Sequence, residues 1–421
     1  MTGLRPPTEA EWDKAVAALA ADRDEVVLAC HVSPDADAVG SMLALAHTLR
    51  RRGTRVLPSF SAPFELAGSL AGLPGVDLLV PPERLPAAPG LLVTLDTGSA
   101  DRLGSLAPLV DSAAEVLVVD HHASNTRFGT LHLVDPAAAA TAVLAEELVR
   151  RLDVELDQDI AACLYAGLVT DTGSFRFAST TPETHELAAR LLRTGIRHDL
   201  ITRRLLDTHP AGWLGMVGAA LGRARLEPDA VGGLGLVWTD TRLAELAAAG
   251  LGADQAESVI DLVRTAAEAE VAMVCKQVAD GGWTVSMRSK GRVDVSAAAV
   301  ALGGGGHRFA AGFSSGADLD ATLAAARAAL AGAPQLPGRP TPPPTRRPRA
   351  TMQSARPQGR PAARPARRAG TTVRPPGRPA ATPIRRPGTT ARPHGPPTRR
   401  PGVTGLALGR AGWWSWTSQP G

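Results

Sequence analysis

The sequence has few cysteines and no long apolar run. Its 421 residues include only three cysteines, Cys30, Cys163 and Cys275, which are odd in number and far apart. We therefore expect neither a disulfide framework nor a thiolate zinc site, and this cysteine use fits a reducing cytoplasm. No apolar stretch reaches the roughly 18–20 residues that a membrane-spanning helix needs. Residues 1–22 lack the cationic start and apolar run of a secretory signal. The sequence thus predicts a cytoplasmic protein that is not embedded in a membrane.

Acidic residues are absent from the C-terminal end of the chain, and this absence divides the sequence into two unlike parts. Residues 333–421 hold 17 arginines, 20 of the 35 prolines, no lysine and no acid. The whole chain has 45 basic and 41 acidic residues, so residues 1–332 keep 28 basic against 41 acidic ones, a net charge of −13. Arg-Pro repeats without an apolar period cannot bury enough surface to offset the entropy of ordering. We predict a disordered Pro/Arg-rich tail after an acidic body that is long enough for two domains.

Apolar runs that alternate with helical patterns predict an α/β fold for the body. Short apolar runs occur at residues 26–30, 55–57, 91–95 and 116–119, and a helix is predicted over 39–51. From residue 141 to about 222 the pattern is mostly helical. Strands separated by helices are typical of a parallel sheet covered on both faces. We place this first domain at residues 10–215.

A second, smaller α/β domain is predicted over residues 226–332, with the boundary between about 212 and 226. Its predicted strands span 234–238, 271–278 and 283–288, and its predicted helices span 243–249, 256–267, 296–302 and 320–330. Asp280-Gly281-Gly282 is a hairpin signal between two of these strands. A glycine-rich loop is expected after residue 302.

Histidines and aspartates follow the predicted strands of the first domain. They are His31, Asp35, Asp37, Asp96, Asp120, His121, His122 and, within the helical stretch, Asp171. The carboxyl ends of parallel strands form one edge of the sheet, where ligands bind. We therefore expect these side chains to meet at one place.

Such a grouping predicts a metal site, although a single aspartate at a strand end is usually a helix cap or a turn residue. Carboxylates packed side by side without cations repel and raise one another's pKa. Two divalent cations resolve that conflict, and one carboxylate can bridge them at roughly 3.5–4 Å. Carboxylate and imidazole ligands without thiolates suit Mn²⁺ or Mg²⁺ better than structural Zn²⁺.

The ordered motifs resemble the DHH phosphoesterases, and the subset of them with a DHHA1 domain. The motifs are His31-Val32-Ser33-Pro34-Asp35-Ala36-Asp37, Asp96, Asp120-His121-His122, Asp171, Ser286-Met287-Arg288-Ser289 and Gly303-Gly304-Gly305-Gly306-His307-Arg308-Phe309-Ala310-Ala311-Gly312. The resemblance covers about residues 10 to 332. It implies a catalytic DHH domain followed by a substrate-binding DHHA1 domain.

The resemblance also implies a role for each residue. One Mn²⁺ would be held by His31, Asp35 and Asp96, and a second by Asp37, Asp96, His121 and Asp171. Mg²⁺ or Co²⁺ are alternatives to Mn²⁺. His122 would contact the scissile phosphate or the leaving oxygen, and Asp120 would orient a histidine.

Residues of the second domain are the candidates for substrate binding. Glycines let backbone N–H groups approach an anion closely, although such a run can also be a plain flexible loop. With Gly305, Gly306, His307 and Arg288, we predict a site for a terminal phosphate. Arg176 is a further candidate, and a structural ion pair is its alternative role.

Within the family, the compact layout resembles the nano-RNase and pAp phosphatase group. We expect hydrolysis of short oligoribonucleotides, 3′-phosphoadenosine 5′-phosphate (pAp) or both, by two-metal activation of water, with pApA and cyclic di-AMP as further substrates. Related enzymes indicate a homodimer. A manganese inorganic pyrophosphatase and a DHH-type single-strand exonuclease are alternatives, although the glycine and His307 motif argues against the first. An RNA-binding protein that acts through the arginine-rich tail is a hypothesis of a different class.

Overall fold

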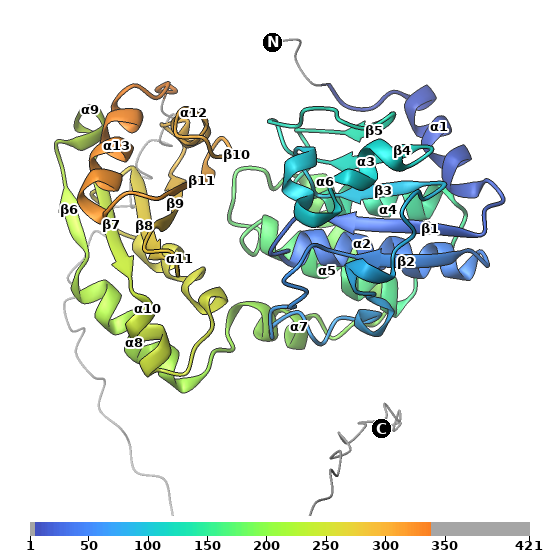
Figure 1. Cartoon of the computed structure of the whole chain (residues 1–421), viewed down its shortest axis with the longest axis horizontal. Coiled ribbons are helices and arrows are strands. Elements are labelled where there is room, and N and C mark those ends of the chain that lie inside the picture. The colour runs from blue at the N-terminus through green and yellow to red at the C-terminus, as the bar shows by residue number, and fades with distance from the viewer. Residues whose placement is uncertain (1–4, 338–421) are drawn as a thin grey trace, which may run out of the picture. The chain divides into compact units, whose positions relative to one another are not determined.

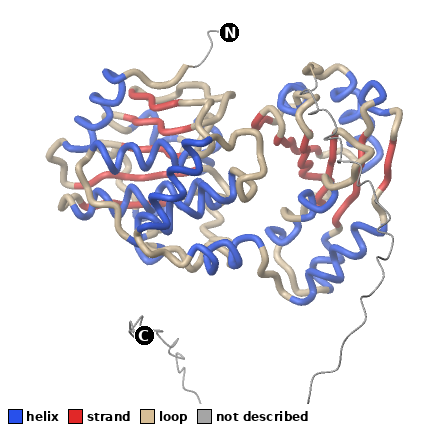
Figure 2. Tube along the Cα trace, turned by 180° about the vertical axis from the view of Figure 1, so that it is seen from behind, coloured by secondary structure: helices blue, strands red, loops and turns tan. Residues whose placement is uncertain are grey.

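The computed structural model of the chain describes residues 5–337, so the tail predicted from residue 333 lies outside the described part from residue 338 onward. The described part contains two β-sheets, each with helices packed beside it (Figures 1 and 2). The strands of the first sheet are β1 (Glu25–Cys30), β2 (Arg55–Ser59), β3 (Leu92–Leu95), β4 (Val116–Asp120) and β5 (Leu131–Val134). Its helices are α1 (Glu9–Ala20), α2 (Ala36–Arg51), α3 (Pro108–Ser112), α4 (Thr141–Arg151), α5 (Gln158–Asp171), α6 (Pro182–Arg193) and α7 (His198–Leu206).

The first sheet is parallel throughout, in the order β2-β1-β3-β4-β5. Its central strands are buried along their length, as expected when both faces of a parallel sheet are covered. Alternate residues of β1 belong to different cores. Val26 and Leu28 pack with α1, α2 and α4, whereas Val27 and Ala29 pack beside the 3₁₀ segment at 100–106. The predicted covered parallel sheet is confirmed.

The strand order places a topological switch between β1 and β3. The chain continues from β1 to β2 on one side, and β3 then pairs with the other side of β1. In a parallel sheet of this order, ligands bind beyond the carboxyl ends of the two strands at the switch. The residues that follow those ends are His31 and Asp96.

Helices α2 and α5 cross with their backbones in close contact. A Cβ atom added to Gly40 would lie less than 3.0 Å from the backbone oxygen of Cys163, and one added to Gly167 would lie 2.9 Å from the Cα atom of Asp37. Only glycine permits backbones to approach so closely. The crossing holds Asp37, in the first turn of α2, against the helix that ends at Asp171.

Helix α2 begins at Ala36, three residues before the predicted start. Asp35 caps it, since its carboxylate accepts the N–H groups of Asp37 and Ala38, both at 3.0 Å. The first turn of the helix therefore coincides with the motif expected to bind metal. Two elements of this part, α1 and β5, were not predicted.

The second sheet has six strands in the order β10-β11-β9-β8-β7-β6, of which only β7 and β8 are parallel to each other. Its strands are β6 (Arg225–Glu227), β7 (Leu236–Thr241), β8 (Val271–Gln277), β9 (Trp283–Ser289), β10 (Gly305–His307) and β11 (Ala310–Ser315). The nearby helices are α8 (Ala211–Gly222), α9 (Ala230–Gly233), α10 (Leu243–Ala248), α11 (Val259–Val263), α12 (Val295–Ala301) and α13 (Leu319–Ala331). The hairpin predicted around Gly281 is confirmed, with a φ of +90° at this glycine.

Two predictions for this part were wrong. The glycine-rich loop contains a short strand, β10, because Gly306 tolerates a φ of +132° and pairs closely with Ala311 on β11. The helix predicted over 256–267 is reduced to a 3₁₀ turn at 253–256 and the short α11. Helix α11 ends early because its last turn tightens into hydrogen bonds such as Thr265 N–H to Leu262 C=O.

None of the helices in the described part is both long and apolar enough to cross a lipid bilayer. The three cysteines are buried and unpaired.

Candidate active site

A first group of side chains gathers at the switch between β1 and β3. His31 follows β1, and its Nε2 atom lies 3.6 Å from Asp96 Oδ2 and 3.9 Å from Asp35 Oδ2. Asp96 follows β3 in a left-handed conformation with a φ of +54°, which aspartate tolerates better than most residues. Two strand ends and the cap of α2 thus supply three ligand-type atoms to one point.

A second group surrounds His121, which follows β4. Its Nε2 atom lies 3.2 Å from Asp171 Oδ2, 3.6 Å from Asp96 Oδ1 and 3.9 Å from Asp37 Oδ2. The two oxygens of Asp96 therefore face different histidines, with Oδ2 toward His31 and Oδ1 toward His121. Asp96 occupies the shared position between the two groups.

Asp120 and His122 form a pair beside the shared carboxylate. His122 Nδ1 lies 2.7 Å from Asp120 Oδ1 and 3.6 Å from Asp96 Oδ1. Asn125 donates from Nδ2 to the other oxygen of Asp120 at 2.6 Å. Asp120 is fully buried and both of its oxygens are engaged, so it holds the ring of His122 with Nε2 left for another partner.

The N-terminus of α4 holds two of the carboxylates. The backbone N–H of Thr141 donates to Asp37 Oδ2 at 2.6 Å, and that of Ala142 donates to Asp37 Oδ1 at 2.9 Å. The Thr141 hydroxyl donates to Asp96 Oδ1 at 2.9 Å, and Ser41 Oγ donates to Asp37 Oδ1 at 3.2 Å. The first N–H groups of a helix have no partner within it, so they stabilise the negative charge of Asp37.

Sequence reasoning missed Thr141, Ser41 and Asn125. A helix start near Thr141 was predicted, but no local pattern connects it with a carboxylate 104 residues earlier in the chain. Asn125 lies five residues after Asp120, and only its spacing within the same loop could have suggested a contact.

Burial raises the free-energy cost of ionising the carboxylates of this site. Asp37 is fully buried, and burial together with Asp96 and Asp171 raises its pKa well above the usual range. Burial opposes ionisation of Asp96 as well, but the nearby imidazoles of His31, His122 and His121 lower its pKa below the usual range.

The pKa values of the three clustered imidazoles, His31, His121 and His122, are raised. Burial would lower the pKa of His31, but Asp96 and Asp35 overcome it and raise the pKa to about 9. Among the described residues, no lysine or arginine forms an ion pair with the clustered carboxylates.

The donor atoms fit divalent cations. His121 Nε2 is buried and has no hydrogen-bond partner, although three carboxylates face it. The ligand-type atoms of His31, Asp35 and Asp96 lie within 4.8 Å of one another, as do those of Asp37, Asp96 and His121. A cation between these atoms would satisfy the orphaned nitrogen and offset the carboxylate charge. A set of imidazole and carboxylate donors without thiolates suits Mn²⁺, Mg²⁺ or Co²⁺.

The second sheet supplies a row of candidate substrate-binding residues. Ala310 pairs with Arg288 on one side and with His307 on the other, so these two side chains share a face of the sheet. The His307 ring stacks on His122 with centroids 4.3 Å apart. Arg288 is half-buried, forms no ion pair with a described residue, and donates only to its neighbour Met287 C=O. Its guanidinium is available for an anion.

The other predicted residues lie in two places. Gly305 and Gly306 belong to β10, next to His307. Arg176 is exposed, and its Nε donates to Gly173 C=O at 2.5 Å, within the turn that follows Asp171. The structure thus brings the eight aspartates and histidines together and gives Arg176 a local hydrogen bond instead.

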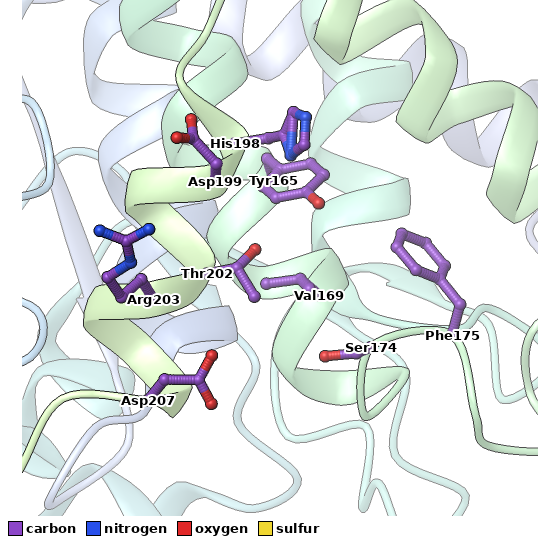
Figure 3. Close-up of a pocket in the computed structure, with 9 residues that line it drawn as sticks. All are labelled: Tyr165, Val169, Ser174, Phe175, His198, Asp199, Thr202, Arg203 and Asp207. Atoms are coloured by element: carbon purple, nitrogen blue, oxygen red, sulfur yellow. The ribbon is translucent and has the colours of Figure 1, made fainter.

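A separate hollow of about 390 Å³ runs between α5 and α7 (Figure 3). It contains none of the clustered side chains. Its lining residues are Tyr165, Val169, Ser174, Phe175, His198, Asp199, Thr202, Arg203 and Asp207. The hollow is therefore distinct from the site at the strand ends.

Comparisons with known proteins show which family the chain belongs to. A model of the DHH family's N-terminal domain matches residues 25–168, and a model of the DHHA1 domain matches residues 240–332. The bifunctional oligoribonuclease and PAP phosphatase NrnA of Thermus thermophilus is 36% identical over 320 residues, which are 75% of this chain and 92% of that protein. The cyclic-di-AMP phosphodiesterase GdpP of Geobacillus thermodenitrificans is 28% identical over 309 residues, which are 70% of this chain and 45% of the relative.

A solved structure shows the same fold. It is an exopolyphosphatase-related protein from Bacteroides fragilis, with a TM-score of 0.69 at 22% identity, and the match covers 77% of this chain and 96% of that one. Both domain models and a relative matched over nearly its whole length lead to one conclusion. The chain belongs to the DHH family of phosphoesterases and carries a DHHA1 domain.

Proposed function

We propose that the chain hydrolyses phosphoester bonds in short oligoribonucleotides and in pAp, and that it uses two Mn²⁺ ions. The observation that carries the proposal is the shared position of Asp96, whose two oxygens face His31 and His121. That arrangement suits two cations bridged by one carboxylate. The similarity to an oligoribonuclease and PAP phosphatase supports the substrate class.

The cluster provides the ligands for both cations. We assign one cation to His31, Asp35 and Asp96, and the other to Asp37, Asp96, His121 and Asp171. When bound, a cation pair lowers the pKa of water and polarises the phosphoryl group. Thr141 and Ser41 hold Asp37 and Asp96 in place for this role.

We assign His122 to the substrate side of the site. Asp120 fixes its Nδ1 atom, which leaves Nε2 to hydrogen-bond the scissile phosphate or the leaving oxygen. Asn125 fixes Asp120 in turn. These two contacts, from Asn125 to Asp120 and from Asp120 to His122, hold one imidazole in a fixed orientation.

The row on the second sheet would bind a second phosphate of the substrate. Arg288 and His307 are two strands apart on one face, roughly 10 Å by the usual strand spacing. Arg288 can form a bidentate contact with a phosphate, and Gly305 and Gly306 lie beside His307 on the edge strand β10. A short substrate held at both ends fits these two sets of groups. Arg176 uses its Nε atom to donate to Gly173 C=O, which leaves its two Nη atoms for a phosphate contact.

A second candidate substrate is cyclic di-AMP together with its linear product pApA. The specific support is the similarity to a cyclic-di-AMP phosphodiesterase across 70% of this chain. The same cluster would serve, since the bond broken is again a phosphoester.

One panel of substrates tests the proposal. The full chain with Mn²⁺ would be offered pAp, 5′-phosphorylated RNA of increasing length, pApA, cyclic di-AMP and pyrophosphate. We expect the highest kcat/KM with pAp or the shortest RNA, and loss of activity in Asp171→Asn. Asp159→Asn, at the other end of the same helix, is the matched control and should retain activity. No hydrolysis of any nucleotide, or full activity in Asp171→Asn, would refute the proposal, and a preference for pyrophosphate would favour the pyrophosphatase alternative.

A further inference from the structure

The hollow between α5 and α7 is lined by residues to which the proposed chemistry gives no role (Figure 3). Its volume of about 390 Å³ lies within the range of small-molecule sites, roughly 300–1,000 Å³. Tyr165 is only 6% exposed, whereas His198, Arg203 and Asp207 are exposed. The hollow therefore has a sheltered aromatic part and a charged rim.

Three hydroxyl groups of the hollow have no hydrogen-bond partner among the described residues. They belong to Tyr165 on α5, Ser174 in the turn after α5, and Thr202 on α7. The Tyr165 oxygen is also not enclosed by protein, so it opens into the hollow. A buried tyrosine usually finds a partner for its O–H group. Here that partner would come from a ligand.

The charged groups at the rim are unequally occupied. Both oxygens of Asp199 accept hydrogen bonds from Arg197, at 2.9 and 2.8 Å, so the charge of Asp199 is already balanced. Arg203 and Asp207 form no ion pair with a described residue. One guanidinium and one carboxylate are therefore free to bind a ligand.

The turn that closes one end of the hollow is strained. Ser174 has a φ of +58° and Phe175 a φ of +61°, a left-handed conformation that is unusual for a bulky residue. The Phe175 N–H donates to Thr172 Oγ1 at 3.1 Å, and the Phe175 ring stacks on His185 with centroids 4.9 Å apart. Strained residues that their surroundings hold in place cluster at ligand-binding positions. Here the strain keeps an aromatic ring at the hollow.

We infer that the hollow binds a nucleoside monophosphate, at a site separate from the catalytic cluster. The base would lie against the rings of Tyr165 and Phe175, since aromatic side chains stack on any base. Asp207 would accept from the ribose hydroxyls, as carboxylates do in other nucleotide sites. Arg203 at the rim would bind the phosphate. The ligand and the hollow share the same division into a neutral part and a charged part.

The lining residues indicate the nucleotide class, and the proposed function suggests which nucleotide is at hand. Hydrolysis of pAp at its 3′-phosphate consumes one water and releases AMP and inorganic phosphate. The link between this hollow and the product rests on the proposed function, whereas binding of AMP does not.

The single tyrosine of the chain, Tyr165, provides a probe that lies in the hollow itself. The full chain labelled with fluorotyrosine should give one fluorine NMR signal, recorded with Mg²⁺ because Mn²⁺ is paramagnetic. We expect AMP to shift this signal saturably. Adenosine and inorganic phosphate alone should each bind about tenfold more weakly or worse, because each lacks contacts that AMP makes. Adenosine that binds as tightly as AMP would overturn the inference.

Two matched arginine variants separate the hollow from the site at the strand ends. Arg203→Gln should weaken AMP binding about tenfold or more, the usual loss for a hydrogen bond to a charged group. Arg288→Gln changes a residue of β9 outside the hollow and should leave AMP binding unchanged. No shift up to millimolar AMP, or a shift that Arg288→Gln abolishes and Arg203→Gln retains, would overturn the inference. Turnover of pAp by the same wild-type sample tests the proposed function separately, because either result can fail while the other holds.

Discussion

Replacing Thr141 with valine tests how strongly the N-terminus of α4 supports the metal site. The Thr141 side chain is fully buried, and its hydroxyl donates to Asp96 Oδ1 at 2.9 Å. Valine keeps the shape of the side chain but removes this donor, while the backbone N–H to Asp37 remains. A hydrogen bond to a charged group is worth about 1.5–3 kcal/mol. Loss of this bond should weaken cation binding about tenfold to hundredfold, the range usual for groups that hold a metal ligand.

Calorimetric titration of the metal-free chain with Mn²⁺ measures the effect. Thr141→Ser keeps the hydroxyl and is the control, so its affinity should stay close to wild type. Turnover of pAp at subsaturating Mn²⁺ should fall in Thr141→Val and recover as Mn²⁺ is raised. If Thr141→Val binds Mn²⁺ as tightly as wild type, the reasoning that Thr141 positions Asp96 is refuted.

Three further changes follow from the contacts described above. Gly167→Ala would place a methyl group 2.9 Å from the Cα atom of Asp37. The destabilisation by overpacking, about 1–3 kcal/mol, should exceed the gain in helix propensity of about 1 kcal/mol. Denaturant unfolding should therefore show a net loss of stability. Asn125→Ala removes the donor to Asp120 Oδ2 and should lower kcat on pAp about tenfold or more with little change in KM. The hydrogen bond from Arg5 and the Thr8 N–H lower the pKa of Glu11 to about 2, from an ordinary 4.5. Because this pKa is lowered in the folded chain, the stabilisation is present above pH 4.5 and is lost as the pH falls through about 2. Glu11→Gln should therefore cost about 0.5–1 kcal/mol at neutral pH and progressively less as the pH falls through that value, by denaturant unfolding at each pH.

Each of these predictions has a result that would contradict it. Unchanged or higher stability in Gly167→Ala would mean that α2 and α5 can move apart freely. Wild-type turnover in Asn125→Ala would mean that Asp120 orients His122 without help. A stability difference for Glu11→Gln that persists at acid pH would assign the effect to packing and not to charge.

The sequence was sufficient to predict where the site lies. Buried apolar strands predict a parallel sheet, and the groups after strand ends at His31, Asp96 and Asp120 were expected to meet at one edge. The structure brings them together at the switch between β1 and β3. The order of the strands was not predictable from the chain, because it depends on which side of β1 each later strand pairs.

The hydrogen bonds that hold the site residues in place could not be predicted from sequence patterns. Thr141 and Asn125 act through single hydrogen bonds, and a lone threonine or asparagine carries no periodic signal. The glycine-rich segment was predicted as a loop because glycine weakens strands in general. At Gly306, however, the absence of a side chain is what lets β10 lie against β11.

The central claim is that the aspartate and histidine cluster catalyses hydrolysis of short nucleotide phosphoesters. The most direct test is the initial rate of phosphate release from pAp by the purified full chain at saturating Mn²⁺, measured for wild type, Asp171→Asn and Asp159→Asn. The account predicts turnover by wild type and Asp159→Asn, and a rate at least a hundredfold lower for Asp171→Asn, which removes a charged group 3.2 Å from His121. Equal rates for all three proteins would contradict it.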